Sequence, residues 1–163
     1  MNKSKNGTIY RLEVSRSTKL ITLTSMAILA VFGVYCILSG KRETIIFSVL
    51  ALAVFLLFLM MPRYLAVDGC TVTVKRVFGE TRIKLSVEEI ETLEELGRGL
   101  LFGSAGLFGW YGVFVVRGET ALVYSRREKK LTLVKSGGRN YVFGVSDEGF
   151  INYLKTCCSQ RAE

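Results

Sequence analysis

The chain has 163 residues, half of them hydrophobic, with a formal net charge of +8 at pH 7 and no histidine. The missing imidazole removes the commonest general base, the usual metal ligand and any Ser-His or Cys-His nucleophile pair. We therefore expect a protein that is not an enzyme and that has no cofactor and no metal site.

Residues 1–19 form a basic N-terminal segment that contains a strand-like stretch. Tyr10, Leu12 and Val14 alternate with the charged Arg11 and Glu13, which is the side-chain period of a β-strand. We expect this stretch to pair with an exposed edge of the β-rich part that follows, because a paired edge no longer promotes association.

Two apolar runs without a charged residue follow, at residues 20–39 and 44–61. As helices they would be about 30 and 27 Å long, close to the hydrocarbon thickness of a bilayer. The spacing predicts a transmembrane helical hairpin over residues 20–62. A secretory signal peptide is the alternative, but its apolar region is shorter and ends at a small-residue cleavage site.

The distribution of Lys and Arg predicts the orientation of this hairpin. Five basic residues precede the first run, two lie between the runs, and four follow within about 20 residues of the second. Lys41 and Arg42 oppose the assignment, yet the totals favour both termini in the cytoplasm. We therefore expect a multi-pass protein of the inner (cytoplasmic) membrane, with Cys70, Cys157 and Cys158 in a reducing compartment.

Beyond Pro62, the only proline, the pattern changes to the two-residue period of strands. We expect a domain over residues 63–158 with seven short antiparallel strands, followed by a tail at 159–163. Ser146 is a suitable N-cap for a C-terminal helix. In that helix Phe150, Leu154 and Cys157/Cys158 repeat at helical spacing, so one stripe can close the end of a curved sheet.

Four stretches of this domain resemble the bacterial PH-domain family: YLAVDG at 64–69, TRIKLSVEEI at 81–90, GLFGWYGVF at 106–114 and YVFGVSDEGFINYL at 141–154. Members of that family often follow transmembrane helices. The resemblance implies a PH-like antiparallel barrel closed by the C-terminal helix, and it brings no catalytic residues.

A glycine-rich apolar segment occupies residues 97–112. Its glycines miss the spacing of a dinucleotide-binding loop, so we interpret them as turns and bulges. Leu107, Phe108 and Trp110 allow two interpretations. The segment either folds over the end of the barrel and completes the core, or it enters the bilayer interface or receives a partner.

A basic turn forms the second candidate contact, at Arg126, Arg127, Lys129 and Lys130. It is either a solvated hairpin tip or a contact for anionic lipid or an acidic partner. The glutamates between residues 88 and 95 are expected to form a solvated face, since a surface run does not split carboxyl pKa values as a catalytic cleft does.

Together these features predict a membrane-tethered PH-like binding or scaffold module that is not catalytic. Its partners would be the lipid bilayer and a protein or peptide, including a second copy of the chain, with no role for nucleic acid. The alternative is the cytoplasmic regulatory domain of an oligomeric membrane assembly or transporter.

Overall fold

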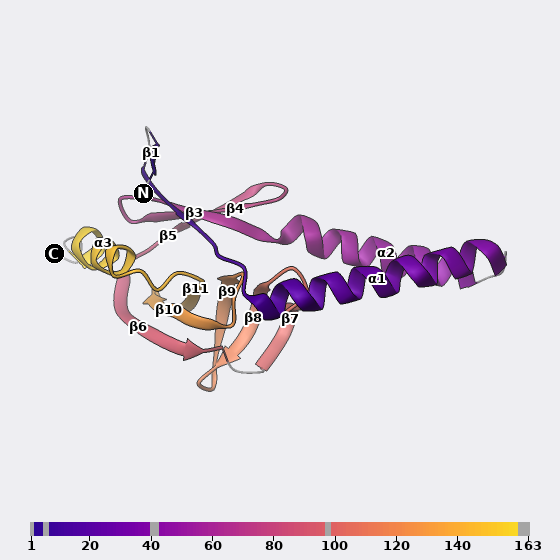
Figure 1. Ribbon diagram of the computed structural model, residues 1–163. Helices are drawn as coiled ribbons and strands as arrows, with labels where there is room; N and C mark the ends of the chain where they lie inside the picture. Colours follow the sequence, from indigo (N-terminus) through magenta and orange to yellow (C-terminus); the bar gives the residue numbers. More distant parts are fainter. Residues whose placement is uncertain (1, 5–6, 40–42, 97–98, 160–163) are drawn as a thin grey trace.

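In the computed structural model, which describes residues 2–4, 7–39, 43–96 and 99–159, two apolar helices project from a β-rich domain (Figure 1). The helices are α1 (Arg16–Ser39) and α2 (Glu43–Met60). The connection at 40–42, the start of the glycine-rich segment at 97–98 and the tail from 160 lie outside the described residues.

The domain contains two sheets and a C-terminal helix. The order of the first sheet is β1-β2-β3-β4-β5, and that of the second is β6-β10-β11-β9-β8-β7. The strands of the first sheet are β1 (Asn2–Ser4), β2 (Gly7–Arg11), β3 (Pro62–Asp68), β4 (Thr71–Arg76) and β5 (Glu80–Lys84). Those of the second are β6 (Val87–Glu95), β7 (Gly99–Ala105), β8 (Trp110–Val116), β9 (Glu119–Ser125), β10 (Lys129–Ser136) and β11 (Arg139–Phe143), and the helix is α3 (Glu148–Ser159).

The predicted barrel closure is wrong, because the two sheets remain separate. The chain turns a corner after β5, where the Leu85 amide donates to the Cys70 carbonyl (2.7 Å) and the Ser86 amide donates to Ser136 Oγ (2.7 Å). From this corner β6 enters the second sheet and pairs with β10, so that β5 stays at the edge of the first. The antiparallel pattern also has one exception, since β11 pairs with β9 in parallel.

The domain is mainly β, as predicted, and its C-terminal helix is present. Phe150, Leu154 and Cys158 form the face that their spacing predicts, and they are buried in a core cluster to which both sheets contribute. The side chain of Cys157 lies outside the description. The helix cap is Asp147 rather than Ser146. Asp147 Oδ1 accepts the Gly149 amide at 2.9 Å, and its carbonyl accepts the Phe150 and Ile151 amides.

The N-terminal segment contains the expected strand, which pairs with β3. β2 is antiparallel to β3, and beyond its last residue the Leu12 amide donates to the Arg63 carbonyl at 3.2 Å. Tyr10 and Leu12 point into the core, where the Tyr10 ring meets Phe150 edge to face at 5.0 Å. The chain therefore leaves the first sheet after β2 and returns to it at the neighbouring strand.

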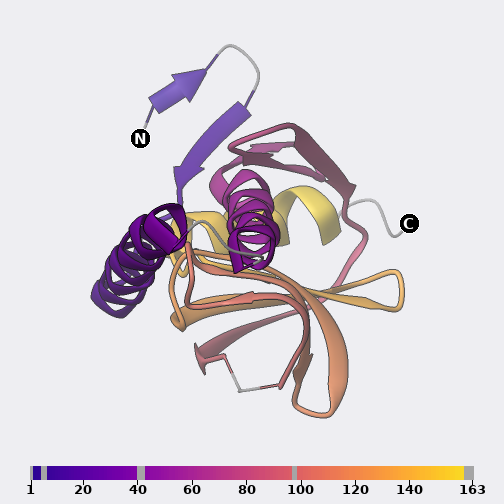
Figure 2. The ribbon, with the colours of Figure 1, turned by 90° about the vertical axis from the view of Figure 1, so that its right-hand side faces the viewer.

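The two helices, which the chain forms between β2 and β3, lie side by side and project from the domain (Figures 1 and 2). A Cβ atom at Gly33 would lie 2.7 Å from the Phe47 ring, so the glycine permits their close approach. Arg16–Cys36 is long and apolar enough to cross a membrane, whereas the apolar part of α2, Phe47–Met60, is shorter.

We predict that Leu12→Ala destabilises the domain by about 2 to 5 kcal/mol, because it leaves a cavity in the main core. Glu13→Ala, an exposed change at the next position, should leave the stability close to that of the wild type. Thermal unfolding of the full-length protein in detergent measures both. Equal melting temperatures for the two variants would show that the N-terminal strand contributes nothing to the core.

Candidate membrane-facing site

The loop at residues 106–109, between β7 and β8, contacts both apolar helices. The Phe108 amide donates to Thr22 Oγ1 of α1 at 3.0 Å, and the Phe108 ring meets Phe58 of α2 edge to face at 5.3 Å. Leu107 packs half-buried in the same cluster, which includes Met61. The protein's own helices therefore cover these two predicted contact residues.

Trp110, the third apolar residue predicted to belong to this contact, lies elsewhere. It is half-buried at the start of β8 and packs against the core of the second sheet, with its ring 6.2 Å from that of Phe114. Its indole Nε1 is buried without a hydrogen-bond partner. Trp110 therefore belongs to the core of the domain rather than to the surface beside the helices.

Tyr111 joins the second sheet to α2. Its side chain is buried, and its hydroxyl donates to the carbonyl of Leu57 near the end of that helix. Burial raises the pKa of Tyr111 to about 12, since the phenolate would lose its hydration. The hydroxyl therefore remains a hydrogen-bond donor across the neutral range.

Two glycines allow the β7–β8 hairpin to take this shape. Gly103 and Gly112 are direct cross-strand partners, with φ values of +130° and +121°. A Cβ atom on either one would collide with the backbone of the opposite strand. The predicted turns and bulges are thus only part of their role, since these glycines also bring two backbones close together.

The basic turn between β9 and β10 holds the beginning of α1. The Ser15 amide donates to the Arg126 carbonyl at 3.3 Å, and Ser17 Oγ donates to a Glu128 carboxylate oxygen at 3.2 Å. Ser15 Oγ in turn accepts the Thr18 amide at 3.1 Å and so caps the helix. The turn and the N-cap together fix where α1 leaves the domain.

The four basic residues predicted to form one contact have different surroundings. The Arg127 guanidinium lies 3.8 Å from a Glu13 carboxylate oxygen and donates to Ser146 Oγ at 3.1 Å. Lys129 Nζ lies 3.8 Å from a Glu95 carboxylate oxygen, and Lys130 is exposed. Arg126 is half-buried. Its pKa is lowered by burial and then by the nearby charges of Arg63 and Arg11.

Exposed apolar side chains lie beside the bases of the helices. Phe78, whose amide donates to the Leu59 carbonyl at 3.1 Å, is 78% exposed, and Phe102 of β7 is 70% exposed. Phe102 also lines a small cavity with Met60 at the end of α2. The pattern of β4 predicts Phe78 on the inner face, but the strand ends at Arg76 and the side chain turns outward.

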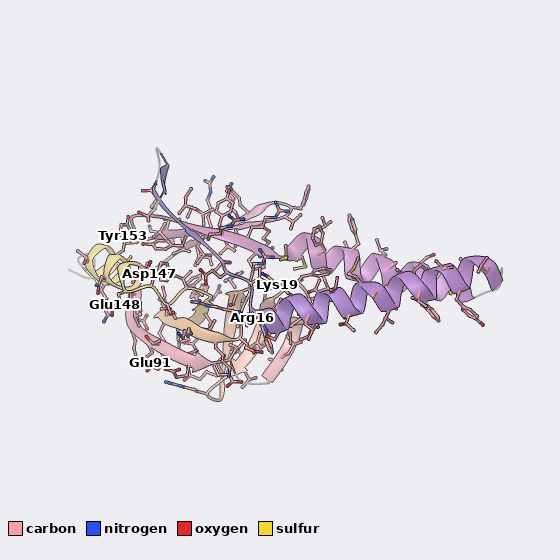
Figure 3. The ribbon with its side chains drawn as sticks, viewed as in Figure 1. Arg16, Lys19, Glu91, Asp147, Glu148 and Tyr153 are labelled. Carbon is pink, nitrogen blue, oxygen red and sulfur yellow. The ribbon has the colours of Figure 1, made fainter. Side chains whose placement is uncertain are left out.

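The helix bases also carry basic side chains. Arg16 and Lys19 lie at the domain end of α1 (Figure 3), and Figure 2 shows α2 in front of the middle of the domain with α1 at one side. This face of the domain combines exposed aromatic and aliphatic side chains with arginine and lysine.

The described residues include no group of three Cys, Asp or Glu side chains that could hold a metal ion. Comparisons of the chain with protein-family models, curated proteins and solved structures give no match. The candidate site is therefore defined by its geometry alone.

We predict that Tyr111→Phe weakens the contact between the domain and α2, at a cost of about 1 kcal/mol for the lost hydrogen bond. The pKa of Tyr111 is 10 in the unfolded state and about 12 in the folded state, so between these two pH values only the folded state keeps the proton. The wild-type protein should therefore lose stability as the pH rises through this range. Tyrosinate absorbance measures the ionisation of Tyr111 in the folded protein: subtracting the variant's titration from that of the wild type should leave a transition near pH 12.

Denaturant unfolding at neutral pH measures the lost stability. Its matched control is Tyr64→Phe, which alters a half-buried tyrosine on β3. The assignment fails if Tyr111 ionises in the folded protein at the same pH as an exposed tyrosine.

Proposed function

We propose that this protein is a membrane-tethered, non-catalytic binding or scaffold module, whose β domain rests on the cytoplasmic surface of the bilayer. The observation that carries the proposal is the exposure of the helices. Only 11% of the most apolar stretch of α1, within Arg16–Cys36, is buried, and large apolar side chains of both helices face outward. A core helix of a water-soluble protein would be mostly covered, whereas a helix that is apolar all round suits a bilayer.

The two helices would form a transmembrane hairpin. The β2–β3 pairing supports this, because it brings the start of α1 and the end of α2 back to adjacent strands. Contacts farther along the helices also favour it, since Thr44 Oγ1 donates to the Cys36 carbonyl at 3.4 Å. A chain that crosses the bilayer and returns to the same sheet must have its N-terminal segment and its β domain on one side.

The exposed apolar side chains at the helix bases indicate how the domain meets the membrane. Phe78 and Phe102 lie next to the last turn of α2, at the level where a spanning helix passes into the headgroup region. Their exposure would be unfavourable in water and favourable in the interface. In this seating the domain would bind a protein, a peptide or an anionic lipid surface.

We expect a tryptophan placed at Phe78 or Phe102 to contact lipid. In a Trp110→Phe background, Phe78→Trp and Phe102→Trp should be quenched by brominated phospholipid in nanodiscs, because both positions lie at the helix bases. Lys84→Trp, at the exposed far end of β5, is the control and should not be quenched. Equal quenching at all three positions would contradict the proposed seating of the domain.

We also expect both termini to lie in the cytoplasm. With the native cysteines replaced, a cysteine introduced at position 41 should react with an impermeant thiol reagent in intact cells. Cysteines introduced at positions 5 and 160 should react only after the cells are opened. Labelling of position 160 from outside intact cells would reverse the orientation.

A further inference from the structure

Three arginines gather where the helices meet the domain. Arg11 ends β2 opposite Tyr64 of β3, Arg63 precedes Tyr64 on that strand, and Arg126 lies in the β9–β10 turn that holds the start of α1. Among the residues that the structure describes, none of the three forms an ion pair with an acidic side chain. No ion pair among these residues therefore offsets the effect of Arg63 and Arg11 on the pKa of Arg126.

Arg126 is the most constrained of the three. It is half-buried, and its Nε atom is buried with no hydrogen-bond partner. Burial and the charges of Arg63 and Arg11 both lower its pKa, so its surroundings disfavour the charged form. A bound anion would offset both the burial and the neighbouring positive charges, because it stabilises the charged guanidinium group. The planar fork of that group also fits the oxygens of a phosphate.

The position of Arg126 indicates the kind of phosphate. It lies against the loop between β7 and β8, where a Cβ atom at Gly109 would be 3.6 Å from Arg126 Cγ. The preceding residue, Phe108, lines one end of an apolar groove between α1 and α2, with a volume of about 530 Å³. Met26, Phe47 and Phe55 are among its other lining residues. A basic cluster next to an apolar groove suits a ligand with a phosphate and a hydrocarbon chain.

We propose that Arg11, Arg63 and Arg126 bind the phosphate of an anionic phospholipid, whose acyl chain lies in the groove between α1 and α2. The proposal rests on the proposed function, since it requires the helices to lie in a bilayer, and it identifies the lipid that the domain recognises. A soluble phosphate would leave the groove empty. A helix from a second copy would fill the groove but would not neutralise the arginines.

The test is a lipid titration of the delipidated full-length protein in detergent, read by native mass spectrometry. Phosphatidylglycerol should bind at least about tenfold more tightly than phosphatidylcholine with the same chains, and inorganic phosphate should bind far more weakly than either. Arg126→Gln should weaken phosphatidylglycerol binding about fivefold, and the triple Arg11→Gln, Arg63→Gln, Arg126→Gln variant about a hundredfold. Arg126→Lys, which keeps the charge but loses the fork, should lie between the wild type and Arg126→Gln.

Arg139→Gln is the matched control, because it removes one exposed arginine at the start of β11. It is the other end of this strand that lies near the β9–β10 turn and Arg126, since Gly144, just beyond that end, lies against Ser125. It should bind like the wild type, and circular dichroism should show every variant folded. The proposal is overturned if the triple variant keeps its affinity, if the two lipids bind equally, or if inorganic phosphate binds as tightly as the lipid. A dimer that excludes lipid from the groove would also overturn it.

Carbonate extraction of membranes from cells that express the protein separates this proposal from the one it rests on. If the wild-type protein is extracted, the proposed membrane insertion fails. If it stays in the membrane and shows no preference for the anionic lipid, only the lipid-binding proposal fails.

Discussion

The pairing of β2 with β3 is the constraint on which the rest of the structure depends. These strands are adjacent in the sheet but about fifty residues apart in the chain, and both helices lie between them. Because the Leu12 amide reaches the Arg63 carbonyl, the start of α1 and the end of α2 must lie close together at the same edge of the domain. Two antiparallel helices satisfy this condition. The β domain thus sets the direction of both helices.

Two further contacts make the helices and the domain one unit. The β9–β10 turn hydrogen-bonds the start of α1, and Phe108 and Tyr111 reach α1 and α2 from the second sheet. Each sheet therefore contacts the helix bases. Under the proposed function, this arrangement would hold the domain in one orientation on the membrane surface. A domain on a flexible tether would instead have a linker that makes few contacts. A ligand bound at the helix bases would contact the helices and both sheets at once.

Local patterns were sufficient to predict the helices, most strands and the capped C-terminal helix. The alternation at Tyr10 and Leu12 also predicted a strand that the structure pairs with β3. The strand β7 was missed because its glycines and exposed leucines have no clear two-residue period. The prediction of a closed barrel was wrong because closure depends on which distant strand pairs with β6, and a local pattern does not determine that partner. The arginine cluster could not be predicted, since its members come from three segments that only the tertiary fold brings together.

Hydrogen exchange of the full-length protein in nanodiscs tests most directly whether the helices are fixed to the sheets. The account predicts that the amides of Leu12 and Ser15, which donate to Arg63 and Arg126, exchange at least about a hundredfold more slowly than those of the exposed turn at Arg117 and Gly118. Exchange at Leu12 and Ser15 as fast as in that turn would mean that the N-terminal strand does not hold the start of α1, and the account would then be contradicted.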